Sequence, residues 1–177
     1  ERVDIATKFS GRVKEVLVAE GDTVTAGQVL AKIDTAELEA QLHEAQAAIR
    51  QSEQQLAQAI ALLAQRKTEL ILAEQELERS KALGAKGYTP QEKVDQRQSA
   101  MLTAQAAVNS ANAGIGQSQA AIEAAIARAE RIKENLKDYV LTAPRNGRVQ
   151  YRLALPGEVL GAGGKVLTLL DLTDVYM

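Results

Sequence analysis

A seven-residue apolar repeat runs through the middle of this 177-residue chain and constrains its fold more than any other feature. Large apolar residues recur at every seventh position from Leu42 to Leu77, and a second series with the same spacing runs from Val94 to Leu136. Such spacing over about six heptads is typical of left-handed coiled coils, and small residues between the large ones let two helices approach closely. The predicted seam comprises Leu42, Ile49, Leu56, Leu63, Leu70 and Leu77 with Ala45, Ser52, Ala59, Arg66, Ala73 and Ser80, and Val94, Met101, Val108, Ile115, Ile122, Ala129 and Leu136 with Arg97, Ala104, Ala111, Ser118, Ala125, Ile132 and Tyr139. The sequence therefore predicts two long helices packed along one seam.

Capping residues mark the ends of these helices. Asp34, followed three residues later by Glu37, has the pattern of a capping box that opens the first helix. Gly84 is expected at the C′ position that closes it, because glycine adopts a left-handed conformation at low cost. Thr89 is expected to cap the second helix, with Pro90 at its first position.

The predicted helices span about 35–83 and 90–138 and are joined by a tip at 84–89. A connection this short permits only an antiparallel hairpin. At 1.5 Å per residue, roughly 49 residues per helix give an arm on the order of 70 Å long. Residues 35–139 are therefore expected to form an α-helical hairpin.

The segments on either side of the hairpin resemble each other. Gly11-Arg12-Val13 matches Gly147-Arg148-Val149, and Gly21 matches Gly157 at the same distance into each copy. Each copy contains β-branched residues that favour strands, then a glycine turn, then a second apolar strand. One copy is too small to bury a core, whereas two together form a small β-sandwich or flattened barrel.

The expected fold is therefore α+β: a β-sandwich in two halves, 1–34 and 140–171, split by the inserted coiled-coil hairpin. The chain has no Trp, one Phe and four Tyr. So few large aromatic residues suit long exposed helices better than a thick globular core.

Composition also excludes several functions. The net charge is −2 and no basic stripe with interleaved aromatics is present, so nucleic-acid binding has little electrostatic support. The absence of cysteine excludes disulfides, thiolate catalysis and cysteine-ligated metals. Neither a nucleophile–base pair nor a carboxylate dyad stands out, and the single histidine, His43, cannot build a metal site. We predict no enzymatic activity and no cofactor.

The chain has no run of about 20 apolar residues that would span a membrane. It opens at Glu1 rather than at Met and stops at Met177 in a stretch that still has strand character. We expect an internal fragment of a longer protein, with any membrane anchor before residue 1.

A β domain split by a coiled-coil hairpin resembles the HlyD-type membrane fusion proteins, the periplasmic adaptors of bacterial efflux and secretion pumps. The resemblance covers essentially the whole chain and identifies the β domain as lipoyl-like. It rests on Gly11-Arg12-Val13 in the first half, and on Thr142-Ala143-Pro144 followed by Gly147-Arg148-Val149 in the second. Residues 172–177 look like the start of the family's β-barrel domain, which would be mostly missing here.

The resemblance implies a periplasmic adaptor that links an inner-membrane transporter to a TolC-like outer-membrane channel. It would be anchored to the inner membrane through a segment before residue 1, and several copies would form a ring. The arm is long for adaptors of RND pumps, which favours an ABC or major-facilitator exporter. The resemblance implies no cofactor and no nucleic-acid partner.

The hairpin tip carries the implied docking site. In adaptors that dock on TolC-like channels the tip has an Arg, a Leu four residues later and then a Ser. Arg79, Leu83 and Thr89 correspond, with Thr in place of Ser and the last spacing one residue shorter. The implied docking surface comprises Arg79, Leu83, Ala85, Lys86, Tyr88 and Thr89. A purely structural interpretation is that Arg79 only complements the helix dipole, Leu83 packs the tip and Thr89 caps the second helix.

Three other interpretations of the chain remain open. A lipoate or biotin carrier needs an exposed lysine at the turn that joins its halves, whereas here the hairpin replaces that turn. A nucleic-acid-binding arm, as in seryl-tRNA synthetase, needs basic residues along one face. The third is an elongated structural coiled-coil protein. Arg66 and Arg97 fall within the seam and are expected to extend outward from it.

Overall fold

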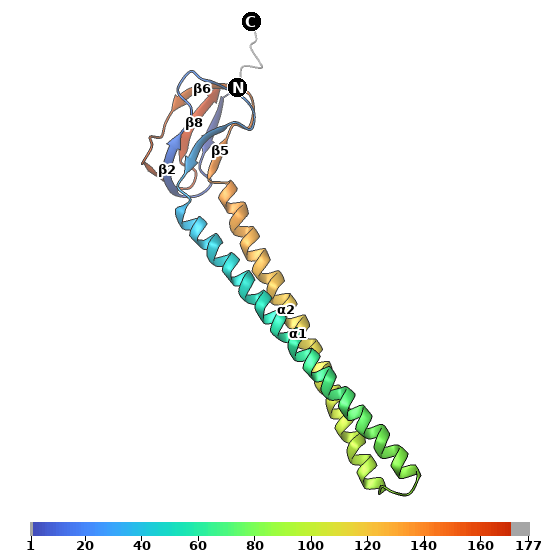
Figure 1. Ribbon diagram of the computed structural model, residues 1–177. Coiled ribbons are helices and arrows are strands. Elements are labelled where there is room, and N and C mark those ends of the chain that lie inside the picture. Colours follow the sequence, from blue (N-terminus) through green and yellow to red (C-terminus); the bar gives the residue numbers. More distant parts are fainter. Residues whose placement is uncertain (1, 171–177) are drawn as a thin grey trace. The chain divides into compact units, whose positions relative to one another are not determined.

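The computed structural model describes residues 2–170, which form eight β-strands and two α-helices (Figure 1). The chain divides into two compact units: a β unit, Glu1–Glu44 with Arg128–Met177, and a helical unit, Ala45–Ala127. The predicted start of a β-barrel domain at 172–177 lies outside the described residues.

The β unit holds two four-stranded antiparallel sheets, with strand orders β1-β8-β6-β3 and β5-β4-β2-β7. The strands are β1 (Arg2–Ala6), β2 (Gly11–Val16), β3 (Thr23–Val24), β4 (Val29–Ile33), β5 (Val140–Thr142), β6 (Gly147–Arg152), β7 (Val159–Leu160) and β8 (Lys165–Leu170). Each sheet takes two strands from each half of the repeat. The predicted β-sandwich built from two halves, split by helices, is confirmed.

The sequence repeat appears in the β unit as a pseudo-two-fold exchange of hydrogen bonds. The Gly21 amide donates to the Val149 carbonyl at 2.9 Å, and the equivalent Gly157 amide donates to the Val13 carbonyl at 2.7 Å. Gly21 and Gly157 have φ angles of 90° and 89°, in the left-handed region that glycine adopts without side-chain strain. The matching glycines therefore serve the same turn in both copies.

A carboxylate closes each of these turns. Asp22 accepts a hydrogen bond from the Ala19 amide at 2.8 Å, and Glu158 accepts one from the Leu155 amide at 3.0 Å. Because each carboxylate satisfies an amide that the turn would otherwise leave to water, Asp and Glu at these positions stabilise the turn as the repeat requires.

Both halves contribute to one hydrophobic core. Val13 is 1% exposed and its repeat equivalent Val149 is 2% exposed. Other core side chains are completely buried, among them Val24, Leu30, Val166 and Leu167. Since the core and both sheets are shared, neither half buries its apolar face alone.

An acidic side chain on β1 is surrounded by donors from β8 and from β1 itself. Lys165 Nζ lies 2.7 Å from the Asp4 carboxylate, and the buried Thr168 hydroxyl donates to it at 2.9 Å. The hydrogen bond from Lys165, with that from Thr168, lowers the pKa of Asp4 below its ordinary value of 3.8. The carboxylate form is therefore favoured in the folded protein.

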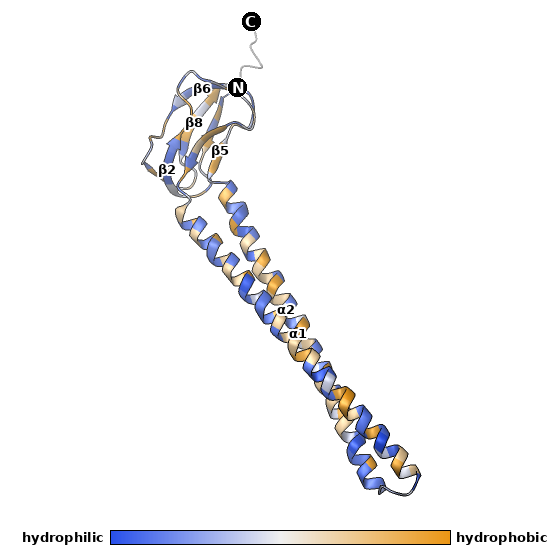
Figure 2. Ribbon diagram, viewed as in Figure 1, coloured by the Kyte–Doolittle hydropathy of each residue, from blue (hydrophilic) through white to orange (hydrophobic). Residues whose placement is uncertain are grey.

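The two helices are α1 (Ala36–Ala85) and α2 (Gln91–Lys137). Every predicted seam position is buried or half-buried, which confirms the heptad pattern. Figure 2 shows apolar residues interspersed along otherwise largely hydrophilic helices, as a narrow seam requires. No helix within residues 2–170 has a stretch long and apolar enough to cross a membrane.

The start of α1 differs from the predicted capping box. The Asp34 carboxylate accepts a hydrogen bond from the Ala36 amide at 3.1 Å, but the Asp34 amide donates to the Arg12 carbonyl at 2.8 Å. The reciprocal bond from Glu37 to that amide is therefore not formed. The N-cap residue is Thr35, which directly precedes the first residue of α1. The prediction was wrong because the chain entering α1 is still bonded to β2.

Candidate functional site: the hairpin tip

The tip is a compact turn between α1 and α2. The Gly87 amide donates to the Gly84 carbonyl at 2.9 Å, and the Tyr88 amide donates to the Leu83 carbonyl at 3.0 Å. With Gly87 at a φ of 77°, these bonds form a Schellman motif in which Gly87 is the C′ residue. The prediction that Gly84 has this role is wrong. A Cβ atom at Gly84 would lie 3.3 Å from Val94 Cγ2, so glycine there allows the helices to approach closely.

The second helix begins one residue later than predicted. Its first residue is Gln91, so Pro90 rather than Thr89 directly precedes it. The Pro90 carbonyl accepts a hydrogen bond from the Lys93 amide at 3.0 Å. Thr89 is thus a half-buried residue of the turn.

A groove of about 210 Å³ lies along one side of the tip. It is lined by Glu76, Arg79, Ser80 and Leu83 of α1, Thr89 of the turn, and Lys93 and Arg97 of α2. We call this the tip groove. Three of the residues predicted to dock, Arg79, Leu83 and Thr89, therefore lie together around it. The other three, Ala85, Lys86 and Tyr88, are exposed at the end of the hairpin and do not line it.

Positive charge predominates in the tip groove. Arg97 forms an ion pair with Glu76 that joins the two helices. Arg79 and Lys93 have no ion-pair or hydrogen-bond partner for their side chains within residues 2–170. Both cations are thus available to a negatively charged group from outside the chain.

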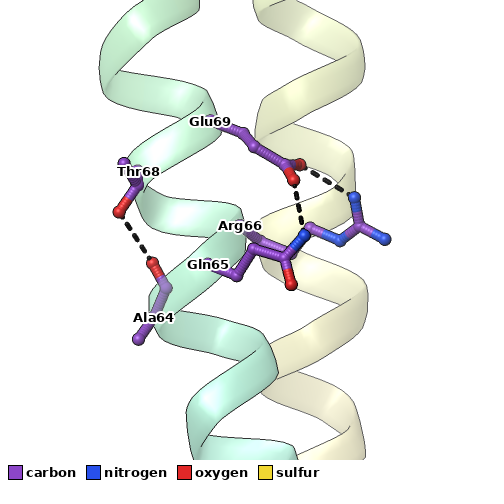
Figure 3. Close-up of polar contacts among 5 residues, drawn as sticks. All are labelled: Ala64, Gln65, Arg66, Thr68 and Glu69. Atoms are coloured by element: carbon purple, nitrogen blue, oxygen red, sulfur yellow. Dashed lines mark hydrogen bonds and ion pairs between the residues drawn. The ribbon is translucent and has the colours of Figure 1, made fainter.

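The two seam arginines extend outward from the seam as predicted, with side chains 40% exposed at Arg66 and 42% exposed at Arg97, and each meets a carboxylate there. Arg97 is half-buried and paired across the hairpin, as described above. In Figure 3, Arg66 donates to Glu69 at 2.8 Å, and Gln65 donates to the same carboxylate at 2.9 Å, all from α1. These contacts lower the pKa of Glu69, with the hydrogen bond from Arg66 the larger cause. A charged residue in the seam therefore keeps its polar head at the edge, where a carboxylate meets it.

A buried hydroxyl also belongs to the tip groove. Ser80 is 8% exposed, and its Oγ atom has no hydrogen-bond partner. An unpaired buried hydroxyl costs free energy that a partner would recover. Ser80 is therefore a candidate contact for a bound group.

Sequence reasoning did not identify Lys93 as a site residue, although the heptad pattern contains the signal. Lys93 directly precedes the seam residue Val94, and Leu83 directly precedes Gly84, which stands seven residues after the seam residue Leu77. In an antiparallel pair, positions that precede the large seam residue come together on one edge. Heptad numbering of both helices would have placed Lys93 beside Leu83.

A second groove of about 330 Å³ lies between the helices in the middle of the helical unit. It is lined by Ala59, Leu62, Arg66, Ala107, Ser110, Ala111 and Gly114. We call this the lateral groove. Its lining is mostly small and apolar, and Leu62 is 43% exposed at its edge. Such a surface suits packing of another apolar helix better than binding of a polar ligand.

Residues 2–170 contain no cluster of three or more His, Asp or Glu side chains that could hold a metal ion. His43 is exposed on α1.

Comparison with known proteins gives a consistent pattern. A protein-family model described as the barrel-sandwich hybrid domain of RND membrane fusion proteins matches residues 1–171. The fatty acid resistance protein FarA of Neisseria gonorrhoeae is 30% identical over 194 residues, covering 99% of this chain and 49% of FarA. The UPF0194 membrane protein YbhG of Salmonella arizonae is 31% identical, covering 94% of this chain and 58% of its own length.

Among solved structures, MacA from Actinobacillus actinomycetemcomitans is similar with a TM-score of 0.65 and 25% identity. The match covers 97% of this chain and 49% of the MacA chain. The chain thus spans about half to three fifths of the length of these relatives.

Proposed function

The chain belongs to the RND-type membrane fusion proteins with a barrel-sandwich hybrid domain, and on this premise we propose that it is the central part of a periplasmic adaptor in an export system. It links an inner-membrane transporter to an outer-membrane channel and performs no covalent chemistry. The full-length protein is anchored to the inner membrane by a segment that precedes residue 1.

One observation carries this proposal: the β unit holds the two ends of a long hairpin together. The Ile33 amide donates to the Tyr139 carbonyl at 2.9 Å. Lys8 Nζ lies 2.7 Å from the Asp138 carboxylate, and the Phe9 and Tyr139 rings stack with centroids 5.8 Å apart. These contacts fix where both helices leave the β unit. A protein that works by position rather than by chemistry needs such a fixed base.

The tip is the proposed contact with a TolC-like channel. Arg79, Leu83 and Thr89 line the tip groove, and Ala85, Lys86 and Tyr88 add an exposed rim. Tyr88 is 78% exposed and Leu83 is 42% exposed, so both side chains are accessible to a partner, and tyrosine is a residue type enriched in protein interfaces. Their exposure supports a protein contact at this end.

The proposed inner-membrane partner is an ABC or major-facilitator exporter. The support is the length of the helices, which have 50 and 47 residues, so that α1 extends about 75 Å at 1.5 Å per residue. The matching family model carries the RND name. Co-purification of the full-length adaptor with an exporter from its own host would show whether the partner is an ABC, a major-facilitator or an RND transporter.

We propose self-association of several copies into a ring, supported by the lateral groove. Its small residues, among them Ala107 and Gly114, leave a hollow on one edge of the helical unit. A Cβ atom at Gly114 would meet nothing within 4 Å, so a neighbouring side chain has room to enter. A second copy of this chain provides helices with exposed apolar residues such as Ile71 and Leu102, which are 53% and 57% exposed.

In-cell photo-crosslinking tests the adaptor role. A photoreactive residue replaces Leu83 in the full-length protein, and Gln54, which is exposed on α1 away from the tip, serves as the control position. We expect a crosslink from position 83, but not from position 54, to an outer-membrane channel. Self-crosslinks alone from position 83 would contradict the proposal.

An export assay provides a second test. Leu83→Glu is expected to abolish export, because a charge replaces the apolar contact at the tip, while the far-UV helix signal stays unchanged since Leu83 is 42% exposed. Normal export by this variant would show that the tip is not the docking surface.

The alternative is an elongated structural coiled-coil protein with no transport role. The coiled-coil seam would be sufficient for such a protein. A structural spacer, however, would not need the unpaired cations at the tip, so these favour the adaptor. Deletion of the gene separates the two: loss of export of any compound supports the adaptor, and altered cell shape with normal export supports the spacer.

A further inference from the structure

The charges of the tip groove are not balanced within the chain. Three cations, Arg79, Lys93 and Arg97, and one carboxylate, Glu76, line the groove. The Glu76 carboxylate already forms an ion pair with Arg97. Arg79 on α1 and Lys93 on α2 are left without a partner within the described residues.

We propose that the tip groove binds a carboxylate side chain, an Asp or a Glu that lies next to an apolar residue in a loop of the outer-membrane channel. This inference rests on the proposed function and specifies the chemistry of its docking contact. Arg79 and Lys93 hold the carboxylate from the two helices, and Leu83 contacts the apolar neighbour.

Charge complementarity identifies the bound group as an anion. Hydrogen bonds between a guanidinium or ammonium group and a carboxylate are among the strongest in proteins, and they fix the orientation of the acceptor. A liquid water occupies about 30 Å³, so a groove of about 210 Å³ has room for a short acidic side chain and the groups beside it.

Ser80 gives an independent indication of a ligand. Its hydroxyl lines the groove, is buried, and has no partner. A carboxylate oxygen seated between Arg79 and Lys93 supplies an acceptor for this hydroxyl. The cost of the unpaired hydroxyl in the free protein is then recovered on binding.

Leu83 indicates that the anion belongs to a protein. A free anion would gain nothing from an apolar side chain that is 42% exposed at the rim of the groove. A loop that carries an acidic and an apolar residue together would bury Leu83 and pair both cations at once.

The test measures the dissociation constant between the purified full-length adaptor and the channel identified by crosslinking from position 83. The variants are Arg79→Gln and Lys93→Gln. The matched control is Lys81→Gln, which also removes one positive charge near the tip, from a residue that pairs with Glu78 at 3.6 Å and does not line the groove. We expect each groove variant to weaken binding about tenfold or more, and the control to change it less than about twofold.

A charge reversal completes the test. Lys93→Glu is expected to abolish binding, and replacement of the channel's acidic loop residue by Lys is expected to restore it. Equal losses for all three glutamine variants, or a crosslinked loop without a carboxylate, would overturn the inference while leaving the adaptor role intact. A failure of position 83 to crosslink any channel would overturn both.

Discussion

The pseudo-two-fold core predicts that equivalent substitutions in the two halves destabilise one and the same structure. Val13 lies on β2 and Val149 on β6, and they are 1% and 2% exposed. Their carbonyls accept equivalent hydrogen bonds, from Gly157 and Gly21. We therefore expect Val13→Ala and Val149→Ala to have the same effect on stability.

The magnitude follows from the two methyl groups that each substitution removes. Transfer of two methylene-sized groups from the core to water accounts for about 1.6 kcal/mol. The cavity left behind, of roughly 50 Å³, adds about 1 kcal/mol at the cost measured for core cavities. Each variant should thus lose about 2–3 kcal/mol of the free energy of unfolding of the β unit. Val159, on β7, is 67% exposed, so Val159→Ala should change stability by less than about 0.5 kcal/mol.

Hydrogen exchange read by mass spectrometry is the appropriate assay, because the helices dominate the far-UV signal of the whole protein. Each variant should accelerate exchange in strands of both halves, for example in β4 and β8, by the same factor. A difference of more than about 1 kcal/mol between the variants would refute the reasoning. So would faster exchange confined to the half that carries the substitution.

Three further predictions concern single contacts. Gly87→Ala should destabilise the hairpin by about 1 kcal/mol, because its φ of 77° disfavours a side chain; the thermal midpoint of the helix signal measures this loss. Asp4→Asn should lower stability at pH 7, since the contact with Lys165 that lowers the pKa of Asp4 is weakened. Because the folded-state pKa of Asp4 is lowered, its contribution to stability is fully present above the unfolded value of 3.8 and is lost as the pH falls through the lower folded value. In urea titrations the difference from wild type should therefore begin to shrink below pH 3.8 and vanish only once the pH is below the folded-state value. Glu76→Gln should cost less than about 1 kcal/mol, because both it and Arg97 are more than one third exposed, and the loss should disappear in 1 M salt.

The sequence predicts the periodic parts of the molecule well for a physical reason. A seam or a sandwich requires the same residue type at regular intervals, so chance matches become improbable over many repeats. The tip has no such repetition. Gly84 and Gly87 look alike in the sequence, yet Gly84 permits close approach to Val94 while Gly87 adopts the left-handed conformation. The role of each glycine depends on how α2 packs against α1, and the residues around the glycines do not determine this packing.

The charged groove has a similar limit. Arg79 was identified through the family resemblance, but Lys93 lies fourteen residues away on the other helix. Their meeting depends on the register between α1 and α2. The heptads define that register only when the turn length is known to within one residue.

The exchange of strands between the two halves determines the order in which the protein is able to fold. During synthesis, residues 2–33 emerge before residues 140–170, and neither sheet is complete until the later residues follow. At the usual rates of translation, the roughly one hundred intervening residues take about 5–20 s to appear. For that time β2 and β4 expose the edges that β7 and β5 later cover, and such open edges pair readily with other chains.

The helical hairpin shortens the search that ends this period. Closing a flexible loop of about one hundred residues costs roughly 4 kcal/mol of chain entropy. Ile33 and Tyr139 are hydrogen-bonded in the folded protein, and a hairpin that forms before the sheets would already bring them together. We therefore expect weakening of the seam to slow the assembly of the β unit even where its final stability is unchanged.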